Sequence, residues 1–452
     1  MSTETRSPLE IGEQYLADHP ELEMLELVMP DINGAARGKW AKPESIKKAF
    51  QHKLRFPVSA YAGDIWGEGA ANTGLVFEAG DQDGIAVPVT NSLKPVTWYT
   101  RPTAQIMMGL TRDDGTPFYG DPRHVLQNVL DRFVEMQLTP VIALEMEFYL
   151  FDENKLQNNI PLAQRFDSDT NLYDLDELHD NEAVIIEIQH ALVALDIPAD
   201  TFVNENAPGQ FEINLLHHND AMLAADQAFL FKRAIKACAK NHGKVASFMA
   251  KPLPNFPGNG MHMHMSLLDN EGNNIFTKQG NQPGEAFGNG IAGILDTLPD
   301  TLAFLAPHAN SYRRLNGSGL APTTLSWGWE NRTSALRLPL ADDTNQRIEH
   351  RVGSADANPY LVIAAILAGV HHGLTNQPAL SEATYGNAYA QHEAVLSMTW
   401  EQAVKRCTEA DFTKEYFGAE FAHLFGAIKA QEIKRFQETI NDFEYFSYLR
   451  NS

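Results

Sequence analysis

The sequence predicts an α+β protein with a small β-rich N-terminal domain over residues 1–104 and a larger domain over residues 105–452. Short strand-like runs separated by turn signals fill the first part. From about Gln105 onward, strands alternate with longer helical stretches. An apolar fraction of 44 % over 452 residues is ordinary for a globular protein with a substantial core. The chain is therefore long enough for two domains.

The N-terminal domain is predicted from its turns. After a polar start, residues 1–20 are expected to contain a short helix. Residues 21–39 then give a strand, an Asp-Ile-Asn-Gly turn and a second strand. Further turn signals at Asp81–Gly84 and Asn91–Pro95 separate more short strands. Together these elements predict a small β-rich domain.

The larger domain is predicted from its helical stretches. Apolar periodicity predicts helices within residues 121–137, 182–196 and 221–243. Residues 358–374 are apolar on most sides, which predicts a buried helix. Residues 376–400 are the most loop-like part, and the remainder of the chain is helical and charged.

The charge and the cysteines exclude several classes of protein. A net charge of −23 argues against nucleic-acid binding and against adsorption on anionic membranes. Such a charge keeps many proteins in solution, and it also attracts metal ions or a cationic substrate. The two cysteines, Cys238 and Cys407, are too few and too far apart for a disulfide framework or a cysteine zinc site. With no signal pattern and no apolar run of about 20 residues, a cytoplasmic enzyme is expected.

Ionisable side chains at alternate positions of strand-like segments are the main chemical signal. Residues two apart on a strand share one face. These side chains are Glu145 and Glu147, His262 and His264 followed by Ser266, Glu349 and Arg351, and Glu205 and Glu212 on either side of a Pro-Gly turn. A single pair is often a solvated strand face, but burying so many charges is costly without a metal or a counter-charge. Oxygen-rich ligands with one imidazole favour Mg²⁺ or Mn²⁺ over zinc.

Arginines supply the complementary charge. The candidates lie in one stretch of about 40 residues, among strand-like runs, and they are Arg313, Arg314, Arg332, Arg337 and Arg351. Guanidinium groups suit carboxylate and phosphate oxygens. Divalent metals together with arginines indicate phosphoryl transfer from a nucleotide. The sequence contains neither a GxxxxGK[ST] loop nor a strand-GxGxxG-helix pattern, so a P-loop or Rossmann turn is not expected.

Ten segments, in this order, resemble the glutamine synthetase superfamily over nearly the whole chain. They are DINGAARGKW, DGTPFYGDPR, EMEFYLF, APGQFEINL, FMAKP, GMHMHMSL, NSYRRL, NRTSALRLP, RIEHR and ADANPYL. The resemblance implies a β-grasp-like N-terminal domain and a catalytic domain whose antiparallel sheet curves into a half barrel. It also implies a homo-oligomer of ten or twelve subunits in stacked rings, with each active site between neighbouring subunits.

The resemblance also implies roles for individual residues. Two or three Mg²⁺ or Mn²⁺ ions are expected per site, with ATP as co-substrate. The first ion is expected on Glu147, Glu205 and Glu212, and the second on Glu145, His262 and Glu349. His264 and Ser266 would contact ATP, as would Arg332 and Arg337. Gly258, Arg314 and Arg351 would bind glutamate, while Arg332, Arg337 and Arg351 would act in catalysis by neutralising the transferred phosphoryl group.

The amine end of the site departs from glutamine synthetase. Where those enzymes carry a glutamate in a GYEAP pattern, this chain has NGSGLAP with Leu320 at that position. The segment AYAGDIWGEG replaces an FDGSS-type segment and places Tyr61 near the position of its aspartate. An apolar group in place of an anion suits an alkyl chain better than ammonium. Asp64 and Glu68 are further candidates for contact with the far ammonium group of a diamine.

These features are most similar to γ-glutamylputrescine and related γ-glutamylpolyamine synthetases. The implied reaction is ATP-dependent ligation of the glutamate γ-carboxylate to putrescine or a related primary amine through a γ-glutamyl phosphate, as a step of polyamine catabolism. The alternatives are a ligase for a monoamine such as ethanolamine, methylamine or isopropylamine, a glutamine synthetase that uses ammonium, and a non-catalytic relative. The sequence leaves the identity of the amine open.

Overall fold

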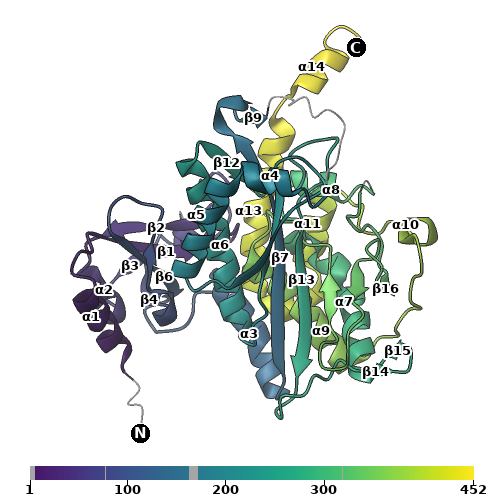
Figure 1. The fold of residues 1–452 in the computed structure, drawn as a ribbon, viewed down its shortest axis with the longest axis horizontal. Helices are drawn as coiled ribbons and strands as arrows, with labels where there is room; N and C mark the ends of the chain where they lie inside the picture. The colour runs from purple at the N-terminus through teal and green to yellow at the C-terminus, as the bar shows by residue number, and fades with distance from the viewer. Residues whose placement is uncertain (1–5, 77, 162–171, 318) are drawn as a thin grey trace.

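The computed structural model describes residues 6–452 except residues 77, 162–171 and 318. Two sheets dominate the fold (Figure 1). A smaller sheet lies near the N-terminus, and a larger sheet curves through the centre of the molecule. The predicted α+β fold class, with a small N-terminal sheet and a larger, mostly antiparallel sheet, is confirmed.

The smaller sheet has the strand order β2-β1-β6-β4-β3, with β5 also paired to β6. Its strands are β1 (Met24–Pro30), β2 (Ala36–Ala41), β3 (Arg55–Pro57), β4 (Asp83–Pro88), β5 (Lys94–Val96) and β6 (Thr103–Thr111). The helices α1 (Pro8–Asp18) and α2 (Ser45–Phe50) pack against each other beside it. The predicted helix in residues 1–20 and the hairpin in residues 21–39 are both present.

The predicted boundary at residue 104 falls inside β6. This strand pairs in parallel with β1, for example Ala104 with Leu25, so the first sheet continues to Thr111. A parallel partner lies far away in sequence, and no local turn signal marks it. The division of the chain into two domains at residue 104 stays a prediction.

The larger sheet has the order β10-β11-β7-β13-β18-β17-β16, with β12 also paired to β7. Its strands are β7 (Thr139–Asp152), β10 (Ala199–Asn204), β11 (Gln210–Leu215), β12 (Lys244–Ser247), β13 (Met261–Leu268), β16 (Trp327–Trp329), β17 (Leu336–Leu338) and β18 (Ile348–His350). Two short hairpins, β8 (Leu156–Gln157) with β9 (Ile160–Pro161) and β14 (Lys278–Gln279) with β15 (Gln282–Pro283), lie outside it. The long strand β7 is central and pairs with three others.

Helices cover one face of this sheet. The long ones are α3 (Pro122–Glu135), α5 (Glu182–Ala194), α6 (Ala221–Asn241), α7 (Glu285–Leu305) and α9 (Pro359–Asn376), and shorter ones are α4 (Leu175–Asp180), α8 (Ala309–Arg314) and α10 (Ala388–Gln391). The chain ends in α11 (Trp400–Glu409), α12 (Asp411–Phe417), α13 (Ala419–Glu438) and α14 (Asp442–Tyr448). The four predicted helices agree with α3, α5, α6 and α9 to within a few residues. No helix in the described ranges is both long and apolar enough to cross a membrane.

Buried hydrogen bonds connect the turn after β1, in the smaller sheet, to the helices α9 and α13. The Lys429 ammonium on α13 donates to the Asn33 side chain at 2.6 Å and to the Glu432 carboxylate at 2.8 Å. Glu432 also accepts from the Asn33 amide at 3.2 Å. Asn358, which caps α9, donates to the carbonyl of Asp31 at 3.1 Å. The turn after β1 is therefore held against the C-terminal helices.

Helices α7 and α9 approach each other closely because glycines face each other. A Cβ placed on Gly293 would lie 2.3 Å from the Gly369 carbonyl oxygen and 2.4 Å from the Gly373 Cα. Backbone atoms at these distances leave no space for a methyl group. This contact helps to form the apolar layer beneath the sheet.

We predict that Gly293→Ala destabilises the protein by about 1–3 kcal/mol, because the added methyl group pushes two buried helices apart. The measurement is the apparent melting temperature of the purified variant. Gly288→Ala on the same helix is the control, since its Cβ would meet only the flexible side chain of Leu380 at 3.3 Å. Equal melting temperatures for the two variants would contradict the prediction.

Candidate active site

The strand register places the predicted site residues on one face of the larger sheet. Along β7, even-numbered side chains such as Leu144 and Met146 are buried under the helices, whereas Glu145 and Glu147 point to the other, more open face. Glu147 stands directly opposite Glu212 on β11. Cross-strand partners also include Glu145 with His262, His264 with Glu349, and Arg337 with Glu349. Antiparallel pairing thus brings together five segments that are far apart in the sequence.

Two groups of side chains have metal-ligand geometry. Glu145, His262 and Glu349 offer ligand atoms that all lie within 4.8 Å of one another, and so do Glu147, Glu212 and His262. The group of Glu145, His262 and Glu349 is the set that the sequence predicts for the second metal ion. The second group contains two of the three predicted first-metal ligands, together with the imidazole of His262.

Glu205 lies just after β10 and faces the same region. Its backbone N–H donates to the carbonyl of Gln210 at 2.8 Å, across the predicted Pro-Gly turn. Its carboxylate raises the pKa of both Glu147 and Glu212. Among the described residues it belongs to neither compact group, so its role as a direct ligand stays a prediction.

The carboxylates differ in how well their charges are balanced. Burial and the neighbouring Glu205 raise the pKa of Glu147 to about 7. Burial and the carboxylates of Glu147 and Glu145 raise the pKa of Glu212 to about 9. Burial also opposes ionisation of Glu349, but Arg351 overcomes it and lowers that pKa to about 2. Glu147 and Glu212 are therefore the carboxyl groups of the site that most need a nearby cation in order to ionise.

This donor set fits divalent cations such as Mg²⁺ or Mn²⁺. The ligands are carboxylate oxygens with one imidazole, the preference of hard cations. Burial lowers the pKa of His262 to about 4, so its ring is neutral at pH 7 and able to coordinate a metal. A cation would also supply the positive charge that the pair Glu147 and Glu212 lacks.

Two of the predicted arginines bond a carboxylate of the site, that of Glu349. Arg351 pairs with Glu349, and Arg337 bonds the same carboxylate at 2.5 Å and Glu330 at 3.0 Å. Arg332 is exposed. Its charge helps to lower the pKa of Glu330, and it opposes the rise in the pKa of Glu205. Positive and negative groups thus meet at Glu349.

Arg314 is buried and its direction is fixed. Its guanidinium donates to the carbonyls of Val352 at 2.9 Å and Arg351 at 3.2 Å. A Cβ on Gly260 would lie 2.7 Å from this guanidinium, and one on Gly258 would lie 2.2 Å from the Ala250 carbonyl oxygen. Glycine at both positions therefore leaves room for Arg314 beside the sheet.

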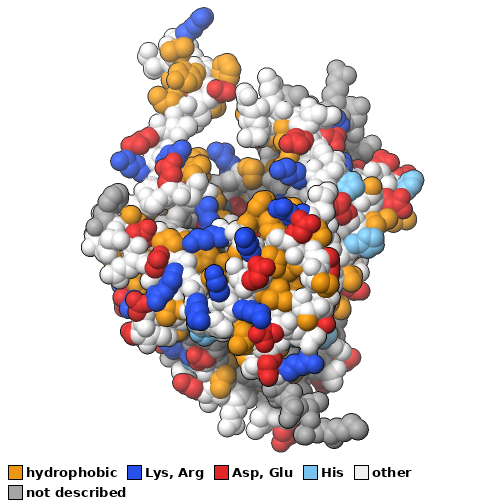
Figure 2. All heavy atoms as spheres, turned by 90° about the vertical axis from the view of Figure 1, so that its left-hand side faces the viewer, with side chains coloured by type: hydrophobic (Ala, Val, Ile, Leu, Met, Phe, Trp, Pro, Cys, Tyr) orange, Lys and Arg blue, Asp and Glu red, His pale blue; other side chains and the backbone are white. Residues whose placement is uncertain are grey.

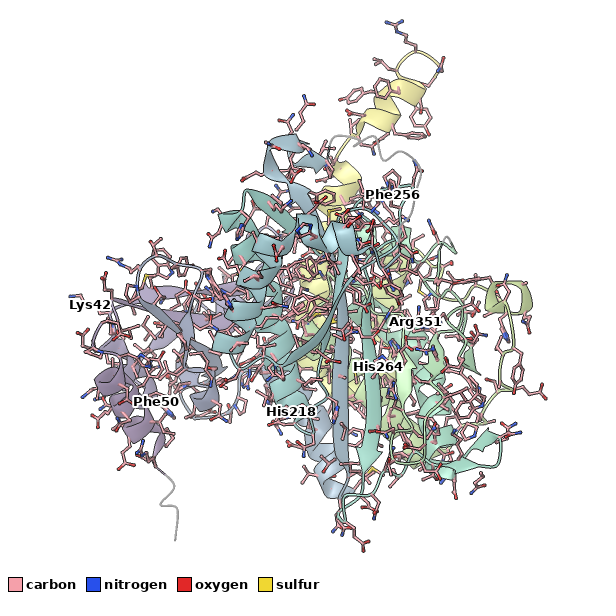
Figure 3. The ribbon with its side chains drawn as sticks, viewed as in Figure 1. Lys42, Phe50, His218, Phe256, His264 and Arg351 are labelled. Atoms are coloured by element: carbon pink, nitrogen blue, oxygen red, sulfur yellow. The ribbon has the colours of Figure 1, made fainter. Side chains whose placement is uncertain are left out.

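A cavity of about 600 Å³ opens beside Glu145 and contains the predicted nucleotide contacts His264 and Ser266. His264 bonds Glu145 at 2.8 Å. Arg347, which the sequence analysis did not single out, also lines this cavity and donates to His264 at 3.2 Å. Arg347 lies two residues before Glu349 and four before Arg351, so the same alternate spacing could have identified it from the sequence. Figure 3 shows His264 and Arg351 near each other beside the central strands.

The predicted amine-site residues do not lie together. Leu320 is 49 % exposed and lies in the loop that follows α8. Glu68 is exposed and its carboxylate lies 3.4 Å from the Arg435 guanidinium. Within this chain, Glu68 is therefore paired with a cation of α13.

Tyr61 and Asp64 are both buried within the chain. The Tyr61 side chain is fully buried and donates to the carbonyl of Met108 at 3.3 Å. The buried Asp64 carboxylate accepts from the backbone N–H groups of Trp66 and Glu68 and from the Gln431 amide. Both side chains are hydrogen-bonded inside the chain, and their contact with the amine stays a prediction.

Comparison with known proteins agrees with this geometry. The catalytic domain of glutamine synthetase matches residues 119–448. The chain is 36 % identical to the γ-glutamylputrescine synthetase PuuA of Escherichia coli K12, with 97 % of this chain and 94 % of that protein covered. It is 28 % identical to a glutamate–isopropylamine ligase of Pseudomonas, over 99 % of each chain.

Similarity extends to solved structures. The ADP complex of GmaS superposes with a TM-score of 0.81 at 27 % identity, over 96 % of this chain and 98 % of that one. The family match spans well over half of the chain and includes the strands that carry the carboxylates. The chain therefore belongs to the glutamine synthetase family and is an ATP-dependent ligase that works with divalent metal ions.

Proposed function

We propose that this enzyme joins the γ-carboxylate of glutamate to putrescine or to a related alkylamine or polyamine. The observation that carries the proposal is Leu320. It is a half-exposed apolar side chain where the resemblance puts a glutamate, in a chain whose set of carboxylates and arginines is otherwise intact. The similarity to a γ-glutamylputrescine synthetase over almost the full length of both chains supports it further.

The proposed reaction has two steps. An oxygen of the glutamate γ-carboxylate attacks the γ-phosphorus of ATP, and ADP leaves. The amine nitrogen then attacks the γ-carbon of the acyl phosphate, which releases phosphate and a proton. Both steps place negative charge on oxygens, so fixed positive groups lower their barriers.

This chain's own residues supply part of that charge. Arg314 and Arg351 would hold the carboxylate of bound glutamate, and Arg332 and Arg337 would neutralise the transferred phosphoryl group. His264, Ser266 and Arg347 line the cavity in which ATP would lie. Two or three Mg²⁺ or Mn²⁺ ions on the carboxylates and His262 would add positive charge at the phosphates. Leu320 would contact the carbon chain of the amine.

A ligase for a monoamine is the second candidate. It is favoured by the similarity to the glutamate–isopropylamine ligase, and an apolar Leu320 suits isopropylamine as well as putrescine. A glutamine synthetase that uses ammonium is the third, and the missing carboxylate at Leu320 argues against it.

We further propose a homo-oligomer, with ten or twelve subunits and sites between neighbours. Exposed aromatic side chains support it, since surfaces of this kind are typical of interfaces. On α14, Phe443 and Phe446 are 67 % and 85 % exposed. Figure 2 shows this helix standing clear of the body, and it shows apolar side chains gathered among Lys and Arg on one face. A cytoplasmic location stays a prediction from the sequence.

We predict that phosphate release from ATP, with glutamate and Mg²⁺ present, depends on an alkylamine. The assay compares putrescine, spermidine, isopropylamine, ethanolamine, methylamine and ammonium as acceptors. Turnover that is at least about tenfold faster with putrescine than with ammonium supports the proposal, since that ratio corresponds to about 1.4 kcal/mol. Preference for isopropylamine selects the second candidate, and equal or better turnover with ammonium overturns the proposal.

We predict that Glu212→Gln weakens divalent-metal binding. The variant loses one negative ligand from the group with Glu147 and His262, and a lost ligand reduces affinity by about tenfold or more. The measurement is the rise in melting temperature with increasing Mg²⁺ or Mn²⁺, without substrates. Glu153→Gln, at an exposed position just beyond β7, is the control and should respond like the unmodified protein.

We predict that Leu320→Glu lowers the preference for alkylamines. A carboxylate replaces apolar contact area and adds an anion that suits ammonium, so the ratio of kcat/KM for putrescine to that for ammonium should fall about tenfold. Leu340→Glu is the control, because Leu340 is 70 % exposed on a different loop. An unchanged ratio in the Leu320 variant would show that this loop does not contact the amine.

A further inference from the structure

The loop that carries Leu320 is held in place from one side. We define the Leu320 loop as Gly319, Leu320 and Ala321. Gly319 has φ +77°, a left-handed conformation that glycine adopts without strain. A loop with an exposed apolar side chain has no core of its own, so its position depends on contacts that it makes with neighbouring segments.

Tyr389 on the short helix α10 provides such a contact. Its hydroxyl lies 3.1 Å from the Ala321 carbonyl oxygen and 3.4 Å from the Gly319 carbonyl oxygen. The single O–H proton is shared between these two acceptors. They stand on either side of Leu320, so this hydroxyl fixes the backbone from which the leucine side chain projects.

The helix α10 is in turn anchored to the turn that carries Arg332. The Asn331 amide donates to the carbonyls of Thr384 and Gly386, each at 2.9 Å. The Thr333 hydroxyl accepts from the Ala388 N–H at 3.0 Å. Asn331 is buried, so these bonds are shielded from water. A continuous series of hydrogen bonds therefore runs from the residues around Arg332 to the Leu320 loop.

Tyr389 also lies near the arginines proposed to hold glutamate. Burial raises its pKa, and the positive charges of Arg351 and Arg314 offset part of that rise. The phenol thus stands between the glutamate end of the site and the loop that would meet the amine.

We propose that Tyr389 is a positioning residue for amine selection, because its hydroxyl holds the Leu320 loop against the site. This inference rests on the proposed function. Tyr389 takes no part in bond making or breaking, and it acts on the amine through Leu320. Loss of the hydroxyl should therefore change how the amine binds and leave the activation of glutamate by ATP intact.

The test is Tyr389→Phe in the full-length purified enzyme, with putrescine and ammonium as acceptors. Removing one hydroxyl should raise the KM for putrescine about 3- to 10-fold, the usual effect of losing one hydrogen bond. The kcat at saturating putrescine and the KM values for ATP and glutamate should stay within twofold, about 0.4 kcal/mol. Tyr385→Phe is the matched control, since Tyr385 belongs to the same segment and is 67 % exposed.

Two outcomes would overturn the inference. An unchanged KM for putrescine would show that the hydroxyl does not position the loop, and a KM for glutamate that rises as much as that for putrescine would assign Tyr389 to the glutamate site. The melting temperature of both variants controls for unfolding. If the unmodified enzyme uses no alkylamine, the proposed function and this inference fail together. If it does and Tyr389→Phe behaves like Tyr385→Phe, the inference alone fails.

Discussion

The arrangement of the site depends on an unfavourable interaction, the crowding of carboxylates on one face of the larger sheet. Glu147 and Glu212 stand directly opposite each other on paired strands. Like charges in such positions destabilise a sheet. Burial raises their pKa values to about 7 and 9, and neighbouring carboxylates add to the rise, Glu205 at Glu147 and Glu147 at Glu212. The helices on the other face keep the strands paired through apolar burial, so the sheet can hold these charges until a cation balances them.

The balance between acidic and basic side chains on this face differs from one pair of strands to the next. At β18 and β17, arginines already neutralise Glu349. At β7 and β11, burial and neighbouring carboxylates raise the pKa values of Glu147 and Glu212, so a cation is needed there to favour the ionised forms. A phosphate chain that spans the two sides would meet guanidinium groups at one end and metal ions at the other. Glycine is needed at positions 258 and 260 beside this face, since any larger residue would collide with its neighbours there.

The sequence predicted the parts of this structure that depend on local pattern. The alternation of charged and apolar residues indicated which face of β7 carries Glu145 and Glu147, and apolar periodicity placed the long helices. Contacts between distant segments could not be read in the same way. The parallel pairing of β6 with β1 extended the first sheet past the expected boundary. The burial of Tyr61 and Asp64 was not foreseen, because the sequence around them does not reveal which way their side chains point. The link between Tyr389 and Ala321 joins residues 68 positions apart, and no local pattern announces it.

The anchoring of α10 by Asn331 has a consequence for engineering new substrate ranges. Three segments that are separate in sequence are connected here by hydrogen bonds, and they are the turn next to Arg332, the 384–389 segment and the Leu320 loop. A loop transplanted alone from a relative would arrive without its support and would sample many conformations. A graft that brings both segments together would preserve the scaffold, and it would leave the phosphate chemistry of the central strands untouched.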